Sequence, residues 1–246
     1  MSQQTFLKRV YLPAAILIVA FLVIARLLWV GTQPYYDWWE TISGLYQPND
    51  LAANPVGAYF FWAAMVTLGL IFFPTILYVH PRLSQYRMRL TRLGSFWMAI
   101  GGIGFLLVGF VPQGTLDFLL PSVGSGGILH YIVEKFHEVC TGMGVIGVLF
   151  GQIVYWIAIR NGKVPVNHKL DVLNICIWWG AFILGAISAG GAYLVFQTDW
   201  TGQIPLNISL FFTFGVWERI FYGLIVSYFG IIGLMIPDRL DLSKMP

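Results

Sequence analysis

The chain has 246 residues, of which 58% are hydrophobic, 17% aromatic and only 10% charged. Soluble domains carry about 25% charged residues, so this composition excludes an ordinary soluble domain and indicates a membrane protein. The formal net charge is +3, and since the sequence contains no basic block, it gives no indication of a nucleic-acid partner.

Six apolar runs follow one another along the chain, each long enough to cross a hydrocarbon core of about 30 Å. We expect helices at about 10–30, 57–79, 94–111, 130–159, 171–196 and 208–236. The first run lacks a small-x-small cleavage site, so we interpret it as a retained span and not as a signal peptide. The sequence therefore predicts an all-α, multi-pass protein in which residues 1–246 form one bundle of six transmembrane helices.

Basic residues gather on one side of this predicted bundle. That side holds 11 of the 14 Lys and Arg residues: Lys8, Arg9, Arg82, Arg87, Arg89, Arg92, Arg160, Lys163, Lys169, Arg239 and Lys244. The positive-inside rule makes this side and both termini cytoplasmic, in a cell or plasma membrane. Within the connector 80–92, HPRLSQYRMRLTR, the arginines are expected to meet anionic lipid headgroups, and the alternative is a docking surface for a cytosolic partner.

The first outer loop, residues 31–55, is rich in Trp and Tyr, which favour headgroup depth. A short interfacial helix here would place the carboxylates of Asp37 and Glu40, three residues apart, on one face. Both side chains would then lie over the outer mouth of the bundle.

Polar residues also recur at helical spacing where the fourth helix begins. His130, Glu134, His137 and Glu138 fall on one stripe of a 3.6-residue helix. A helix over 130–159 would be about 45 Å long, so its first turns stand at or above the outer headgroups and the stripe has a simple explanation as a solvated face.

The sixth predicted helix carries Glu218 and Arg219 within an otherwise apolar span. Each charge costs at least about 2.5 kcal/mol on insertion scales, so both side chains are expected to face the bundle interior and find partners such as His137, Glu138 or Arg26. The residues of the two helices and the first loop together predict an outward-facing polar pocket. A structural ion-pair network and a ligand site both remain open.

Three chemistries fit this set of side chains. Glu134 and His137 form an E-x-x-H spacing, and His130 and Glu138 could complete or support a metal site there. Such a site would serve a membrane-embedded metal-dependent hydrolase. Haem ligation is disfavoured because the two outer histidines share one helix. The third chemistry is noncovalent: a cavity whose acids and Arg219 hold a lipid headgroup, or a proton-coupled pathway. The sequence does not identify catalytic residues. We expect either no cofactor or a divalent metal ion.

Four segments carry a family resemblance: TISGLYQPNDLAANPVGAYFFW, GFLLVGFVPQG, HYIVEKFHE and WERIFYGLIVSYFGIIG. They resemble the six-helix FRAG/DRAM/SFK membrane proteins and, still more, the allied prokaryotic family of unknown function numbered 998. The resemblance points to Asn54, Pro112, His130, His137, Glu218 and Arg219, and it implies a connection with lipid remodelling, GPI-anchor maturation, lipid asymmetry or autophagy. Glu134 and Glu138 are not part of the shared pattern, which weighs against a metal site built on them.

The functional prediction is therefore noncovalent handling of a lipid or amphiphile in the outward-facing pocket. The first alternative is the metal-dependent hydrolase, and the second is a scaffold subunit of a larger membrane complex. Membrane lipids are the expected partners, and other membrane proteins are possible ones.

Overall fold

The computed structural model describes residues 1–29, 54, 56–110, 136–198 and 214–238, and throughout these ranges the regular structure is helical. The chain begins with α1 (Gln3–Phe6), a π-helical turn η1 (Leu7–Tyr11) and α2 (Leu12–Leu27). The helices α3 (Gly57–Phe110), α6 (Phe136–Asn161), α7 (His168–Thr198) and α9 (Phe214–Met235) follow. The predicted all-α class is confirmed for this part of the chain, and the first outer loop and its proposed interfacial helix lie outside it.

Three of these helical segments are long and apolar enough to cross a membrane: Gln3–Leu27, Gly57–Phe110 and Val139–Asn161. They coincide with the first four apolar runs of the sequence. The fifth and sixth runs correspond to α7 and α9, whose described apolar stretch Arg219–Met235 is shorter.

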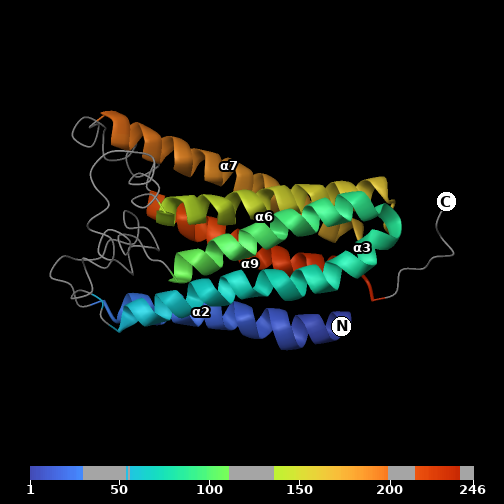
Figure 1. Ribbon diagram of the computed structural model, residues 1–246, viewed down its shortest axis with the longest axis horizontal. Helices are drawn as coiled ribbons and strands as arrows, with labels where there is room; N and C mark the ends of the chain where they lie inside the picture. The colour runs from blue at the N-terminus through green and yellow to red at the C-terminus, as the bar shows by residue number, and fades with distance from the viewer. Residues whose placement is uncertain (30–53, 55, 111–135, 199–213, 239–246) are drawn as a thin grey trace.

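Helix α3 is two helices in one, because its backbone leaves the helical region at Arg87, where φ is −144° and ψ is 72°. Figure 1 shows α3 turning back there toward the end of the bundle at which it begins. Helical structure otherwise continues through 80–92, so the segment expected to be a connector consists of the ends of the two arms. Pro74 and Pro81 both lie within the first arm and do not end it.

The second arm of α3 packs on α6 through glycines. A methyl group added at Gly104 would lie 2.8 Å from the Cα of Gly144, and one added at Gly147 would lie 2.5 Å from the Cα of Gly101. Real Cβ atoms do not approach other atoms this closely, so the two backbones touch directly. Small residues commonly allow such close approach between helices in membranes.

Aromatic side chains join both arms of α3 to α9. The ring of Phe72, on the first arm, lies 5.8 Å from that of Phe105 on the second arm and 4.8 Å from that of Phe229 on α9. Phe105 in turn lies 5.7 Å from Tyr222 of α9. All of these rings are buried, so this cluster forms the centre of the bundle.

Arg82 ties together three parts of the chain that are distant in sequence. Its guanidinium donates to the carbonyl of Met1 at 2.8 Å, to the carboxylate of Asp238 at 3.0 Å and to the carbonyl of Tyr78 at 2.7 Å. The Tyr78 hydroxyl donates to the carbonyl of Ile236 at 2.6 Å. The N-terminus, the bend of α3 and the end of α9 therefore lie at one end of the bundle, which we call the basic end (Figure 1).

Candidate functional site

Four of the eight residues predicted to form the outward-facing pocket belong to described helices, and they lie toward the end of the bundle opposite the basic end. His137 and Glu138 belong to the first turn of α6, and Glu218 and Arg219 belong to α9. Both helices begin at that opposite end (Figure 1). Arg219 is the one member of the eight whose side chain is described, and it is partly buried. The remaining candidates, Asp37, Glu40, His130 and Glu134, lie outside the described residues, so the pocket stays a prediction.

The predicted metal site is also untested by the structure. Among the residues that the structure describes, no group of three or more His, Cys, Asp or Glu could hold a metal ion. Two of the three predicted ligands, His130 and Glu134, lie outside those residues, so the structure does not test the set.

Asn54, to which the family resemblance points, is buried where α3 begins. Its side-chain Nδ2 donates to the backbone carbonyl of Ala25 at 3.1 Å, and its backbone carbonyl accepts from the backbone N–H of Ala58 at 3.0 Å. Asn54 therefore ties the end of α2 to the first turn of α3. The other loop residue of the resemblance, Pro112, lies outside the described residues.

The clearest described site is a groove at the basic end, of about 810 Å³. The bend of α3 forms one wall, and the end of α6 with the connector to α7 forms the other. The lining residues are Tyr86, Arg87, Met88, Arg89, Leu90, Arg160, Asn161 and Lys163. Four of them are cations, and none is an acid. We call this the basic groove.

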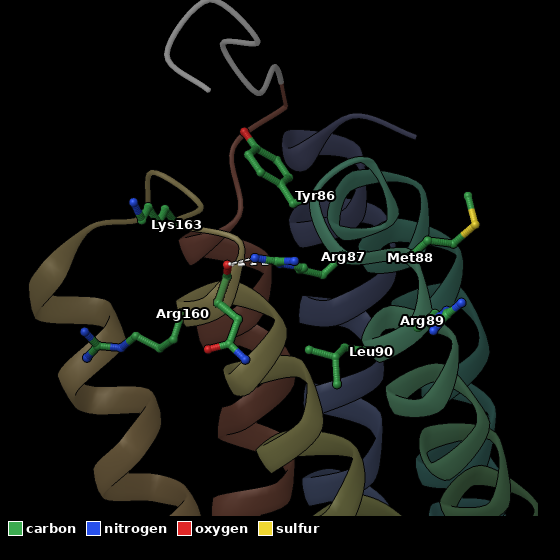
Figure 2. A pocket seen from close by; sticks show the side chains of 8 residues that line it. Tyr86, Arg87, Met88, Arg89, Leu90, Arg160 and Lys163 are labelled. Carbon is green, nitrogen blue, oxygen red and sulfur yellow. Dashed lines mark hydrogen bonds between the residues drawn. The ribbon is translucent and has the colours of Figure 1, made fainter. Parts of the chain in front are cut away.

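Arg87 holds the two walls of the basic groove together. Its Nε and Nη2 both donate to the carbonyl of Asn161, at 3.0 and 2.9 Å, and Figure 2 shows the side chain reaching from the bend of α3 to the end of α6. A helix ends with unsatisfied carbonyls and partial negative charge, which a cation stabilises. The non-helical backbone at Arg87 thus places its guanidinium where α6 needs a donor.

The remaining cations of the groove differ in whether their side chains already form ion pairs within the protein. Arg160 forms an ion pair with Asp171 at 2.6 Å. The side chains of Arg89 and Lys163 make no hydrogen bond or ion pair with any residue in the described ranges, so their charges remain available. Lys163 sits in the α6–α7 connector with a left-handed φ of 50°.

The electrostatic balance of the basic end is strongly positive. The described residues of the predicted cytoplasmic side include nine Lys and Arg residues but only two carboxylates, those of Asp171 and Asp238. Both carboxylates are already in ion pairs, with Arg160 and Arg82. An anion at this end would therefore meet unneutralised positive charge.

His80 lies in the segment 80–92, which was expected to be a connector between two helices. It lies within α3, and its Nδ1 is 2.8 Å from the hydroxyl of Ser95, which is 2.8 Å from the buried hydroxyl of Tyr155. This chain of hydrogen bonds joins both arms of α3 to α6 beneath the basic groove. The expectation failed because it assumed that helical structure stops before residue 80.

These features define an all-α protein with several long apolar helices and a positively charged groove at one end. Comparison of the sequence and structure with family models, curated proteins and solved structures finds no match. The resemblance to the FRAG/DRAM/SFK proteins and their prokaryotic relatives therefore stays a prediction.

Proposed function

We propose that the chain is an integral membrane protein that crosses the bilayer six times and binds lipid. The proposal counts the two arms of α3, of 30 and 23 residues, as separate crossings. The other four crossings are Gln3–Leu27, α6, α7 and α9, the shortest of which has 22 residues. About 20 residues suffice to span the hydrocarbon core, so each of these segments is long enough.

The proposal places the basic end on the cytoplasmic side. The positive-inside rule favours this orientation, because the basic groove and its neighbouring Lys and Arg residues lie at one end of the helices. Reporter domains fused to the C-terminus provide the test, since a reporter active only in the cytoplasm should then be active. An active periplasmic or extracellular reporter would reverse the orientation.

The observation that carries lipid binding is the position of the basic groove beside apolar surface. Arg89 and Lys163 offer uncommitted charge, and Met88, Leu93 and Phe96 are exposed nearby on the same arm of α3. An anionic lipid could place its phosphate against the cations and its acyl chains along the arm. Each basic residue near a membrane surface contributes about 1 kcal/mol to such binding.

A double substitution, Arg89→Gln with Lys163→Gln, tests the groove. Two lost contacts correspond to about 2 kcal/mol, which is roughly 30-fold in affinity. The matched control is Arg92→Gln with Lys169→Gln, which removes the same charge at the same end but outside the groove lining. Native mass spectrometry with phosphatidylglycerol and phosphatidylcholine measures the bound lipid.

The groove variant should lose phosphatidylglycerol while the control keeps most of it, because screening limits distant charges to about 8 Å at physiological salt. Phosphatidylcholine binding should be weak in all three proteins. Equal losses in the two variants would mean that only diffuse charge attracts lipid, and the groove would not be a site.

At the opposite end, the proposal keeps the outward-facing pocket as the place where a lipid or amphiphile is handled. Its support is the common end at which α6 and α9 begin, together with the partly buried Arg219. Charged residues within membrane helices usually face the bundle interior or a water-filled cavity, and they often mark functional sites.

A further inference from the structure

A polar seam runs along the interface between α6 and α7. On α6, three polar side chains are spaced four residues apart, and on α7 three more recur at intervals of three and four. Both spacings keep the side chains on one face of a helix. The seam consists of Gln152, Trp156 and Arg160 on α6, and of Asp171, Asn174 and Trp178 on α7.

Two contacts hold the seam together, one on each side of a gap. Nearer the basic end, Arg160 Nη2 lies 2.6 Å from Asp171 Oδ2. Deeper in the bundle, Trp178 Nε1 donates to the carbonyl of Leu149 at 2.9 Å. Between these contacts the helices leave a partly open cavity of about 130 Å³.

The cavity is lined by polar groups that the fold leaves without partners. Gln152 is 1% exposed, and neither its Nε2 nor its Oε1 has a hydrogen-bond partner among the described residues. The same holds for Oδ1 of Asn174, which is 3% exposed, and for Nε1 of Trp156. The remaining lining is apolar or aromatic: Ile153, Ile175, Trp178 and Trp179.

The depth of these groups makes their lack of partners significant. Gln152 lies nine residues before the end of α6 at Asn161, which corresponds to about 13 Å along the helix axis. In the membrane arrangement proposed above, it lies well inside a hydrocarbon core of about 30 Å, where the bilayer offers no water to an unsatisfied amide. Buried polar groups are normally hydrogen-bonded, so a bound molecule is expected to supply the missing bonds.

The lining also restricts what that molecule is. The cavity presents donors on Gln152 and Trp156 and acceptors on Gln152 and Asn174, so the ligand must both accept and donate. Arg160 and Asp171 neutralise each other at one edge, so the ligand carries no charge. The volume equals about four water molecules at roughly 30 Å³ each, and indole rings provide flat walls for C–H groups.

We propose that this cavity binds an uncharged polyol group of about the size of glycerol, either free or carried as the headgroup of a neutral lipid. Each hydroxyl both donates and accepts, which matches the carboxamide of Gln152, the N–H of Trp156 and the carbonyl of Asn174. The carbon backbone of the polyol packs against the tryptophan rings. The site is separate from the basic groove and does not depend on lipid binding there.

The test uses the full chain purified in a zwitterionic detergent whose headgroup has no hydroxyl. Thermal unfolding is followed while monoacylglycerol is added. The control is the fatty-acid methyl ester of the same chain length, which lacks the two hydroxyl groups. Free glycerol is compared with glycine betaine at equal osmolality, which corrects for general stabilisation by solutes.

Gln152→Leu is the principal variant, because it keeps the approximate size of the side chain and removes both amide atoms. Ser227→Ala is its matched control, since that exposed hydroxyl donates only to the carbonyl of Gly223 in its own helix, at 2.7 Å. The parent and the control should show saturable stabilisation, and Gln152→Leu should bind at least tenfold more weakly. Without polyol, Gln152→Leu should unfold at the same temperature as the parent or above it, because it no longer buries a bare amide.

Comparing free glycerol with monoacylglycerol distinguishes the source of the polyol. Stabilisation by glycerol alone identifies a free ligand, and stabilisation by monoacylglycerol identifies a lipid-borne one. The absence of a response to both, or an equal response of the parent and Gln152→Leu, would overturn the proposal and leave a cavity that holds water only. If Gln152→Leu does not fold, Asn174→Leu takes its place, and binding equal to that of the parent would then overturn it.

Discussion

Replacing Gly147 with alanine adds a methyl group where α3 and α6 touch through their backbones. The new Cβ would lie 2.5 Å from the Cα of Gly101 and 2.7 Å from the carbonyl oxygen of Trp97. Optimal contacts between carbon atoms are at about 3.5–4.0 Å, so the helices must separate locally by about 1 Å. Neither obstacle is a side chain that can rotate away.

The size of the effect follows from two opposing contributions. Overpacking costs about 1–3 kcal/mol, and replacing glycine by alanine within a helix returns up to about 1 kcal/mol. Gly142→Ala is the matched control on the same helix, because nothing lies within 4 Å of a Cβ added there. The control should be as stable as the parent or slightly more stable, and Gly147→Ala should be about 1–3 kcal/mol less stable than the control.

Reversible unfolding in mixed micelles of mild detergent and dodecyl sulfate, followed by circular dichroism, measures this difference. Comparing two Gly→Ala variants cancels the contribution of helix propensity, so what remains is packing. Equal stability of the two variants would refute direct backbone contact between α3 and α6, and with it the arrangement on which the basic groove and the polar seam depend.

The remaining predictions concern the two ends of the bundle. Arg82→Ala should destabilise the protein by about 2 kcal/mol, because it removes charged hydrogen bonds to Met1 and Asp238, and Arg82→Lys should restore only part of this loss in thermal unfolding. Glu218→Gln should weaken amphiphile binding with little change in unfolding temperature. A stability loss of about 3–5 kcal/mol there would instead assign Glu218 to a structural ion-pair network. Elemental analysis of the purified protein should find no stoichiometric zinc or iron, and one metal ion per chain would favour the hydrolase.

The existence of the helices could be predicted from the sequence because a chain in lipid must satisfy its backbone internally. Apolar runs of sufficient length therefore correspond to helices in the structure, with α6 beginning at Phe136 and α7 at His168. The exact bend of α3 could not be predicted. Residues 80–92 are rich in good helix formers, and only Arg87 departs from helical geometry, at the residue whose side chain bonds the end of α6.

Hydropathy cannot distinguish the interior of a bundle from its lipid-facing surface, since both are apolar. The two cysteines illustrate this limit: both lie within apolar stretches of the sequence, yet Cys140 is buried whereas Cys176 is exposed on α7. The polar seam was missed for a related reason. Gln152 and Asn174 do interrupt apolar runs, but only the structure shows that they face each other across one cavity.

Helix α6 uses its two sides differently, and this difference determines where the bundle can open. Toward α3 it presents glycines, so separation there would break backbone contact along several turns. Toward α7 it is joined at the seam chiefly by the Arg160–Asp171 ion pair and the indole hydrogen bond of Trp178. Within the described residues, α7 packs more extensively on α9 than on α6. Opening the seam therefore breaks fewer contacts than opening the glycine interface, and we expect any movement that admits a ligand to occur between α6 and α7.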